Sequence, residues 1–88
     1  MNRVVTFEPD AWDDFRVWLK QDLKITKRII ELIKDTKRSP FAGKGKPEPL
    51  KHKFSGYWNR RIDSTHRLVY KATNDAIVVI ACRHHYNY

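Results

Sequence analysis

The sequence has few of the features that mark secreted, membrane-spanning or multidomain proteins. It contains a single cysteine, Cys82, so no disulfide can form within the chain. Its apolar runs are all shorter than the roughly 20 residues that cross a bilayer, and the apolar stretch near the N-terminus is too short for the core of a secretion signal. We therefore expect a cytoplasmic protein that is not inserted into a membrane.

Linkers and repeats are also absent from the sequence. There are only 3 glycines, no Gly/Ser-rich stretch and no internal repeat. A chain of 88 residues is too short to form two hydrophobic cores. We expect a single domain over residues 1–88.

Acidic residues are scarce relative to basic ones. The 10 Asp and Glu residues face 18 Lys and Arg residues, which leaves a net charge of +8. Such a surface attracts polyanions and steers their approach, so RNA, DNA or an acidic protein segment are the expected partners. An anionic membrane would require a helix with a cationic face beside an apolar one, which the predicted helices do not clearly show.

The spacing of apolar residues predicts two helices that follow a short strand over residues 4–7. Pro9 and Asp10 begin the first helix, and the second runs from about Leu23 to Arg38, where Ser39 and Pro40 end it. The first helix is expected to bury Ala11, Trp12, Phe15, Trp18 and Leu19, and the second Ile25, Ile29, Leu32 and Ile33.

Three further strands are predicted over residues 57–62, 66–71 and 76 to about 86, which would form an antiparallel meander. Cys82 lies in the apolar run of the last one, where a buried thiol fits better than a nucleophile. The fold class that follows is α+β, with two N-terminal helices packed on one face of a twisted antiparallel sheet. Between the helices and the meander, glycines and prolines exclude regular structure from a loop that carries Lys44, Lys46 and Glu48.

Strand alternation predicts which side chains face the helices. The helix side would hold Trp58, Ile62, Leu68, Tyr70, Val78, Ile80 and Cys82. The open face would hold Arg61, Arg67 and His85, while Arg60 and His84 would point elsewhere. This assignment depends on the turn at Asn74-Asp75, because its length decides the relative parity of the strands it joins.

Three residue types in this pattern suit RNA cleavage without a metal ion. The reaction needs a base for the 2'-hydroxyl, a cation for the charge that builds on the phosphate, and an acid for the leaving 5'-oxygen. Glu48, Arg67 and His85 can supply these groups. Taken singly, however, each is explained more simply by a solvated surface or by an ion pair between Glu48 and a neighbouring lysine.

The aromatic residues Tyr57, Trp58, Tyr86 and Tyr88 are interleaved with Arg60, Arg61, Arg67 and Arg83. Rings beside guanidinium groups can stack on unpaired bases and contact phosphates, which indicates RNA binding. No metal site is predicted, because His84 and His85 would point to opposite faces of a strand and no other ligand cluster accompanies them. No cofactor is expected either.

Five blocks of sequence resemble the YoeB (Txe) family of toxins from bacterial toxin-antitoxin pairs, within the RelE-like superfamily. The blocks are ELIKDTKRSPF (31–41), GKGKPEPLKH (43–52), SGYWNRRI (55–62), HRLVY (66–70) and ACRHHY (81–86). They occur in order over nearly the whole chain, which makes the resemblance more specific than a single motif. The resemblance implies a RelE-like fold and an endoribonuclease that cuts mRNA in the ribosomal A site and so inhibits translation.

The resemblance also implies roles for individual residues. Glu48 would be the general base, Arg67 the transition-state cation and His85 the general acid, with Tyr86 positioning the substrate. Lys51 and Arg61 match basic positions that would hold phosphates. Lys44, Lys46 and Arg83 complete the set of predicted RNA-binding residues. One departure is that the chain continues beyond the His85-Tyr86 pair with Asn87 and Tyr88.

The implied partners are mRNA, the ribosome and an acidic antitoxin of the YefM kind, with a homodimer as a further possibility. Two alternatives stay open at this point. A ParE-like toxin of the same fold would inhibit a protein target without cutting RNA. A noncatalytic module would use the basic face only to bind RNA or an antitoxin.

Overall fold

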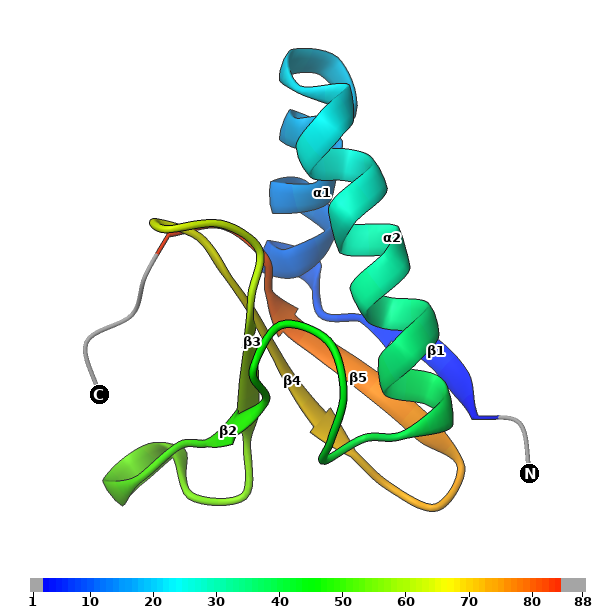
Figure 1. Ribbon diagram of the computed structural model, residues 1–88, viewed down its shortest axis with the longest axis vertical. Helices are drawn as coiled ribbons and strands as arrows, with labels where there is room; N and C mark the ends of the chain where they lie inside the picture. Colours follow the sequence, from blue (N-terminus) through cyan, green and yellow to red (C-terminus); the bar gives the residue numbers. More distant parts are fainter. Residues whose placement is uncertain (1–2, 85–88) are drawn as a thin grey trace.

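Two helices cover one face of a five-stranded sheet in the computed structural model, which describes residues 3–84 (Figure 1). The elements in chain order are β1 (Val4–Phe7), α1 (Pro9–Gln21), α2 (Leu23–Arg38), β2 (Glu48–Pro49), the short 3-10 helix η1 (His52–Phe54), β3 (Trp58–Arg61), β4 (Arg67–Ala72) and β5 (Ala76–Ala81). The predicted α+β class is confirmed. Neither helix within residues 3–84 combines the length and apolar character needed to cross a membrane.

Local sequence signals begin and end both helices. Pro9 supplies the fixed φ angle of the first turn of α1. Asp22 lies between the helices and caps the start of α2, because its side chain accepts a hydrogen bond from the backbone N–H of Ile25 at 3.2 Å. The predicted bounds of α2 are confirmed, and Ile29 and Leu32 are fully buried. Most of the helix stability therefore comes from an apolar face packed on the sheet.

The predicted burial of Trp12 and Leu19 on α1 is wrong, because 48% and 46% of their surfaces are exposed. Trp12 lies at the margin of the core, where its ring packs against Phe7 and Phe15 at centroid distances of 5.7 and 6.1 Å. Leu19 lies towards the turn between the helices, which projects beyond the end of the sheet (Figure 1). An apolar stripe is buried only over the length of helix that has a sheet beneath it.

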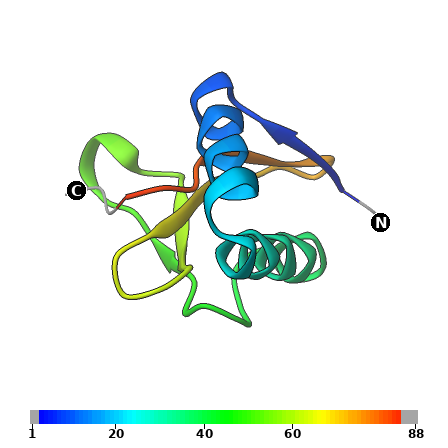
Figure 2. The same cartoon turned by 90° about the horizontal axis from the view of Figure 1, so that it is seen from above.

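The sheet order is β1-β5-β4-β3-β2, so the meander of β3, β4 and β5 is confirmed. The sheet is mixed rather than wholly antiparallel, because β1 pairs with β5 in the parallel direction. After β1, the chain crosses one face of the sheet as α1 and α2 before it enters β2 (Figure 2). The last strand, β5, lies between β1 and β4.

The turn at Asn74-Asp75 and a β-bulge near the end of β5 together decide which residues of this strand face the helices. Tyr70 is paired with Val79, but the neighbouring Val69 is paired with Ala81, so Ile80 is the extra residue. The helix side of β5 is formed by Ile77 and Val79, because a two-residue turn pairs Ala72 with Ile77 and Tyr70 with Val79, and the prediction that Val78 and Ile80 lie there is wrong. The bulge reverses the alternation, so Cys82 returns to the helix-side core as predicted.

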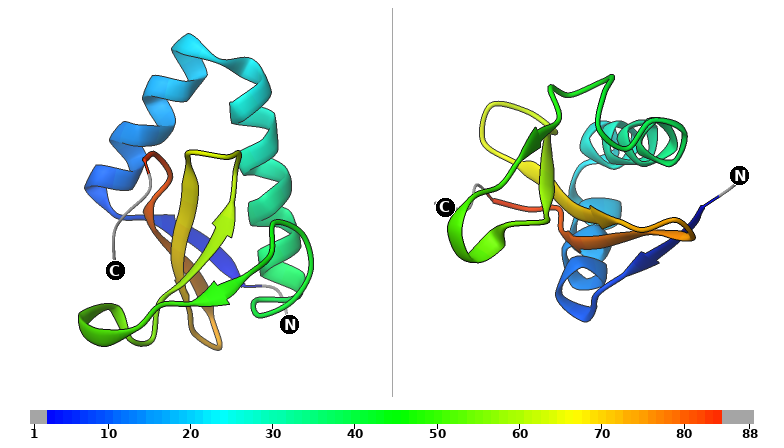
Figure 3. Two further views of the ribbon diagram at one scale, coloured as in Figure 1. Left: turned by 60° about the vertical axis from the view of Figure 1, so that its left-hand side comes forward. Right: turned by 90° about the horizontal axis from the view of Figure 1, so that it is seen from below.

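The face of the sheet away from the helices is not fully open. A second small core there consists of Leu50, Val69 and Ala81, with Phe54, Tyr57 and Ile80 packed around it. The segment that carries η1 joins β2 to β3 at the edge of the sheet (Figure 3), and its residues Leu50 and Phe54 belong to this second core. The predicted open face is therefore restricted to the region that this segment leaves uncovered.

The predicted final strand is too long, because β5 ends at Ala81 and residues 82–84 belong to no strand. His84 has a φ angle of 70°, in the left-handed region that a strand residue does not adopt. The argument that His84 and His85 point to opposite faces of a strand therefore does not apply to His84. His85, Tyr86, Asn87 and Tyr88 lie outside the described residues.

Arg60 is fully buried between the sheet and the end of α2, which the charge pattern alone did not predict. Its guanidinium donates to the carboxylate of Asp35 at 2.7 Å and to the hydroxyl of Tyr70 at 3.1 Å. It also donates to backbone carbonyls of the loop that follows α2, at Ser39, Ala42 and Lys44. A buried charge is tolerated only when it is paired and hydrogen-bonded in this way.

Because of Asp35, the free energy of unfolding should depend on pH in the acid range. The backbone N–H of Lys44, followed by the guanidinium groups of Arg60 and Arg38, lowers the pKa of the Asp35 carboxyl to about 2. A pKa depressed by folding stabilises the protein above the ordinary carboxyl range, and this contribution is lost as pH falls towards the folded-state value. Between pH 4 and 2 the free energy of unfolding should fall by on the order of 2 kcal/mol from this group. Urea unfolding at a series of pH values measures it, and Asp35→Asn should lack that component.

Trp58 and Arg67 test the assignment of faces. The Trp58 ring packs on the helix-side core and against Phe41 at a centroid distance of 4.7 Å, whereas Arg67 lies on the opposite face. Trp58→Ala should lower the free energy of unfolding by about 2 to 4 kcal/mol, and Arg67→Ala should lower it much less. Equal melting temperatures for the two variants would contradict the assignment.

Candidate functional site

Glu48 lies on the exposed edge strand β2, where it is paired with Asn59 of β3. The turn before it depends on Gly45, which has a φ angle of 79° and whose carbonyl accepts a hydrogen bond from the N–H of Arg61 at 2.7 Å. A Cβ atom at Gly45 would come within 2.9 Å of the Leu32 side chain and 3.1 Å of the Arg61 carbonyl. The approach of the loop to β3, and thus the start of β2, requires glycine at this position.

The register of three strands places Glu48, Arg61 and Arg67 on one face of the sheet. Glu48 is paired with Asn59, and Arg61 is paired with Arg67, so the side chains within each pair share a face. Asn59 and Arg61 are two residues apart on β3 and point the same way. The structure therefore brings an exposed carboxylate and two arginines to the same side of the sheet, away from the helices.

Arg67 is half-buried, and its guanidinium is held by the turn that precedes β4. Its Nη1 atom donates to the carbonyls of Asp63 at 2.9 Å and His66 at 3.2 Å. The turn is itself fixed by Asp63, whose Oδ1 accepts the backbone N–H groups of Thr65 at 2.8 Å and His66 at 2.6 Å. Desolvation alone would raise the pKa of Asp63, but these two amides, together with the nearby His66 and Arg67 side chains, lower the pKa below its ordinary value. Arg67 is thus a permanent cation with restricted orientation.

The segment after β5 is fixed by side chains of α1. The indole N–H of Trp18 donates to the carbonyl of Cys82 at 2.8 Å, and the carboxylate of Asp14 accepts the N–H of Cys82 at 3.1 Å. Burial raises the pKa of Asp14 and raises that of the Cys82 thiol to about 12. The predicted buried, structural role of Cys82 is confirmed, and sequence reasoning gave no sign of the roles of Trp18 and Asp14.

The predicted RNA-binding residues lie in different surroundings. Lys46, Lys51 and Arg61 are exposed on or beside the strands next to Glu48. The Arg83 guanidinium carbon lies 5.9 Å from the centroid of the Trp18 ring, in a cation–π contact at the end of α1. His85 and Tyr86, the other predicted catalytic residues, lie outside the described residues.

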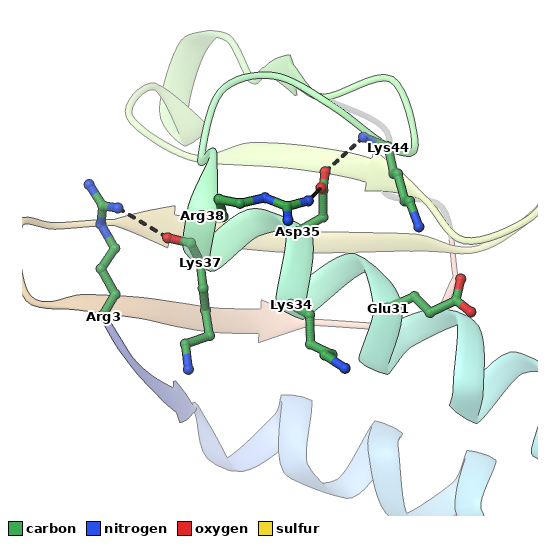
Figure 4. Close-up of a pocket in the computed structure, with 7 residues that line it drawn as sticks. All are labelled: Arg3, Glu31, Lys34, Asp35, Lys37, Arg38 and Lys44. Atoms are coloured by element: carbon green, nitrogen blue, oxygen red, sulfur yellow. Dashed lines mark hydrogen bonds and ion pairs between the residues drawn. The ribbon is translucent and has the colours of Figure 1, made fainter. Parts of the chain in front are cut away.

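Lys44 belongs to a hollow of about 700 Å³ beside the C-terminal half of α2. Figure 4 shows Arg3 extending to the backbone carbonyl of Lys37, and Arg38 and the Lys44 N–H meeting the carboxylate of Asp35. The hollow is lined by Arg3, Glu31, Lys34, Asp35, Lys37, Arg38 and Lys44. The structure thus groups Lys44 with the basic end of α2, and sequence analysis missed this hollow because its residues come from three separate segments.

Within residues 3–84, no group of three or more His, Cys, Asp or Glu side chains is arranged to hold a metal ion. The chemistry available on the Glu48 face is that of a solvated carboxylate on the same side of the sheet as two guanidinium groups, of which that of Arg67 is held by backbone carbonyls. A carboxylate can accept a proton, and guanidinium groups stabilise negative charge on phosphate oxygens. This arrangement suits a phosphate ester whose reaction begins with removal of a proton.

Comparison with known proteins gives consistent results for sequence and structure. Residues 7–86 match the family described as YoeB-like toxin of bacterial type II toxin-antitoxin system. Toxin YoeB of Escherichia coli (strain K12) is 58% identical over 77 residues, which cover 88% of this chain and 92% of that protein.

Two solved structures from Staphylococcus aureus have the same fold. The YoeB dimer superposes with a TM-score of 0.92 at 39% identity, over 98% of this chain and 100% of that chain. A YoeB-YefM complex superposes with a TM-score of 0.89 at 38% identity, again over 98% of this chain and 100% of that chain.

Proposed function

The chain belongs to the YoeB-like toxins of bacterial type II toxin-antitoxin systems, and on this premise we propose that it is a metal-independent endoribonuclease that cleaves mRNA in the ribosomal A site. Such cleavage would stop translation in the cytoplasm. The observation that carries the proposal is the shared sheet face of Glu48, Arg61 and Arg67, set by the β2–β3 and β3–β4 registers.

The proposed reaction is a transfer of the phosphate from the 5'-oxygen to the 2'-oxygen of the RNA. Glu48 takes the proton of the 2'-hydroxyl, and the 2'-oxygen then bonds to phosphorus. Arg67 stabilises the negative charge on the phosphate oxygens, and His85 donates a proton to the 5'-oxygen as its bond to phosphorus breaks. The products are a 2',3'-cyclic phosphate and a free 5'-hydroxyl.

The remaining predicted residues would hold the substrate. Tyr86 positions the nucleotide beside His85, while Lys46, Lys51, Arg61 and Arg83 contact phosphates of the mRNA. Lys44 is included in this group for its charge, although its hollow lies beside α2. The net charge of +8 favours encounter with the ribosome as a whole.

Purified protein incubated with mRNA-programmed ribosomes tests the proposal. New RNA ends carrying a 2',3'-cyclic phosphate, insensitive to a chelator once ribosome integrity is controlled for, would support it. A ParE-like activity would instead leave the mRNA intact and impair DNA supercoiling by gyrase. Binding without either effect would indicate a noncatalytic module.

We predict tight binding to an acidic antitoxin of the YefM kind, and that this binding silences cleavage. A YoeB of Staphylococcus aureus has been solved with YefM, and the charge of +8 favours an acidic segment that folds on the toxin surface. Titration calorimetry at low and high salt measures the affinity, which should weaken with salt but not vanish, because apolar contacts are not screened. Full cleavage in the presence of excess antitoxin would contradict the prediction.

The YoeB dimer of Staphylococcus aureus suggests that this chain also forms a homodimer. Sedimentation of the free protein at increasing concentration tests this directly. A chain that remains monomeric at high concentration would exclude the homodimer from the proposed assembly.

A further inference from the structure

His66 connects the turn before β4 to the segment after β5. Its Nδ1 atom accepts a hydrogen bond from the backbone N–H of His84 at 2.8 Å. Its carbonyl accepts hydrogen bonds from the N–H of Ile62 at 3.0 Å and from Nη1 of Arg67 at 3.2 Å. One residue therefore contacts both the proposed transition-state cation and the last residue before His85.

His84 is held from two directions by adjacent residues of β4 and the turn before it. Its N–H donates to the His66 ring, and its carbonyl accepts the N–H of Arg67 at 3.1 Å. The φ angle of His84 is 70°, a conformation that is unfavourable for a residue with a side chain and persists only when its surroundings impose it. The two hydrogen bonds provide such a restraint at the point where the chain leads into His85.

The orientation of the His66 ring is set by Trp18. The two rings are in edge-to-face contact at a centroid distance of 4.7 Å, and Trp18 is itself buried and bonded to the carbonyl of Cys82. The His66 ring is only partly buried, so a simple core role does not account for its contacts. For Nδ1 to accept the His84 N–H, the ring must carry its proton on Nε2.

We infer that His66 is a positioning residue of the proposed ribonuclease, which holds the backbone of His84 so that the neighbouring His85 is placed relative to Arg67. The inference rests on the proposed function. His66 itself does not contact the reacting atoms. Its contribution is the acceptor atom Nδ1, and a small displacement of a catalytic group from its productive place reduces a rate by up to about a hundredfold.

Two substitutions distinguish the contribution of the Nδ1 acceptor atom of His66 from that of its aromatic ring. Both His66→Ala and His66→Asn remove the aromatic contact with Trp18, but only asparagine keeps an acceptor, its Oδ1 atom, near the position of Nδ1. Each variant is compared with wild type by single-turnover cleavage on programmed ribosomes over a range of ribosome concentrations. Hydrogen exchange of the His84 amide, followed by NMR, reports the state of the hydrogen bond directly.

The expected result for His66→Ala is a single-turnover rate lower by about tenfold to a hundredfold, an unchanged half-saturating ribosome concentration, and a faster-exchanging His84 amide. His66→Asn should restore most of both the rate and the amide protection. The inference is overturned by a wild-type rate in a folded His66→Ala variant, or by equal losses in both variants. An absence of cleavage by the wild-type chain would show instead that the proposed function has failed, and the positioning role with it.

Discussion

Glu48→Ala and His85→Ala should each slow single-turnover cleavage of mRNA on the ribosome by roughly a hundredfold to ten-thousandfold, the range for a lost general base or acid. Arg67→Ala should be at least as damaging, because the charge that it neutralises is largest in the transition state. Ribosome binding should survive all three changes, since the phosphate contacts assigned to Lys46, Lys51 and Arg61 remain.

Arg67→Lys should recover only part of the rate. The Arg67 guanidinium is held through Nη1 by two carbonyls of the turn, and a lysine ammonium cannot reproduce this planar arrangement while facing a phosphate. The matched control is Lys24→Ala, an exposed cation near the start of α2 that has no proposed contact with RNA. Near-native rates for Glu48→Ala and His85→Ala together would reject the acid-base scheme and leave positioning by arginine as the remaining account.

Asp35→Ala should destabilise the fold by about 3 to 5 kcal/mol, because it leaves the buried guanidinium of Arg60 without its carboxylate. A small domain has roughly 5 to 15 kcal/mol of stability in total, so this variant should lose a large part of it and unfold at a markedly lower temperature. The same carboxylate accepts the N–H of Lys44, and the loss should therefore also loosen the loop that leads to Glu48.

Chemical denaturation of Asp35→Ala beside Asp13→Ala measures this effect. Asp13 is an exposed aspartate on α1, so its replacement by alanine should leave the unfolding midpoint almost unchanged. The double variant Asp35→Ala with Arg60→Met should be more stable than Asp35→Ala alone, because no unpaired buried charge remains. An Asp35→Ala variant as stable as wild type would show that the network around Arg60 contributes little.

Alternation of apolar residues predicted the helix-side positions of β3 and β4 correctly but failed in β5. Leu68 and Tyr70 follow a regular strand, so a period of two placed them in the core. In β5 the two-residue turn at Asn74-Asp75 reverses the expected parity, and the extra residue Ile80 reverses it again before Cys82. Nothing in the local sequence distinguishes a bulged isoleucine from a paired one. The covering segment around Leu50 was missed for a similar reason, since its partners Val69 and Ala81 lie on two other strands.

For the candidate site, the sequence predicted which residues take part but not how their side chains are held. The residue types that the reaction needs, and the blocks that resemble the YoeB toxins, are readable in the chain and indicate Glu48, Arg67, His85 and Tyr86. The surroundings of Arg67 were not readable, because its guanidinium is oriented by carbonyls of a turn. The contact of His66 with His84 was not readable either, because it spans 18 residues of sequence.

The sequence by itself determined the helices, the meander, the basic charge and the family, because propensities, apolar periods and ordered motifs depend on residues close together in the chain. The tertiary structure alone decided the parallel pairing of β1 with β5, the bulge at Ile80 and the burial of Arg60 against Asp35, 25 residues away. It also decided that Trp18 and His66 hold Cys82 and His84 in the segment after β5. Each of these features arises from contacts between distant segments, whose free energy becomes available only when the two layers pack together.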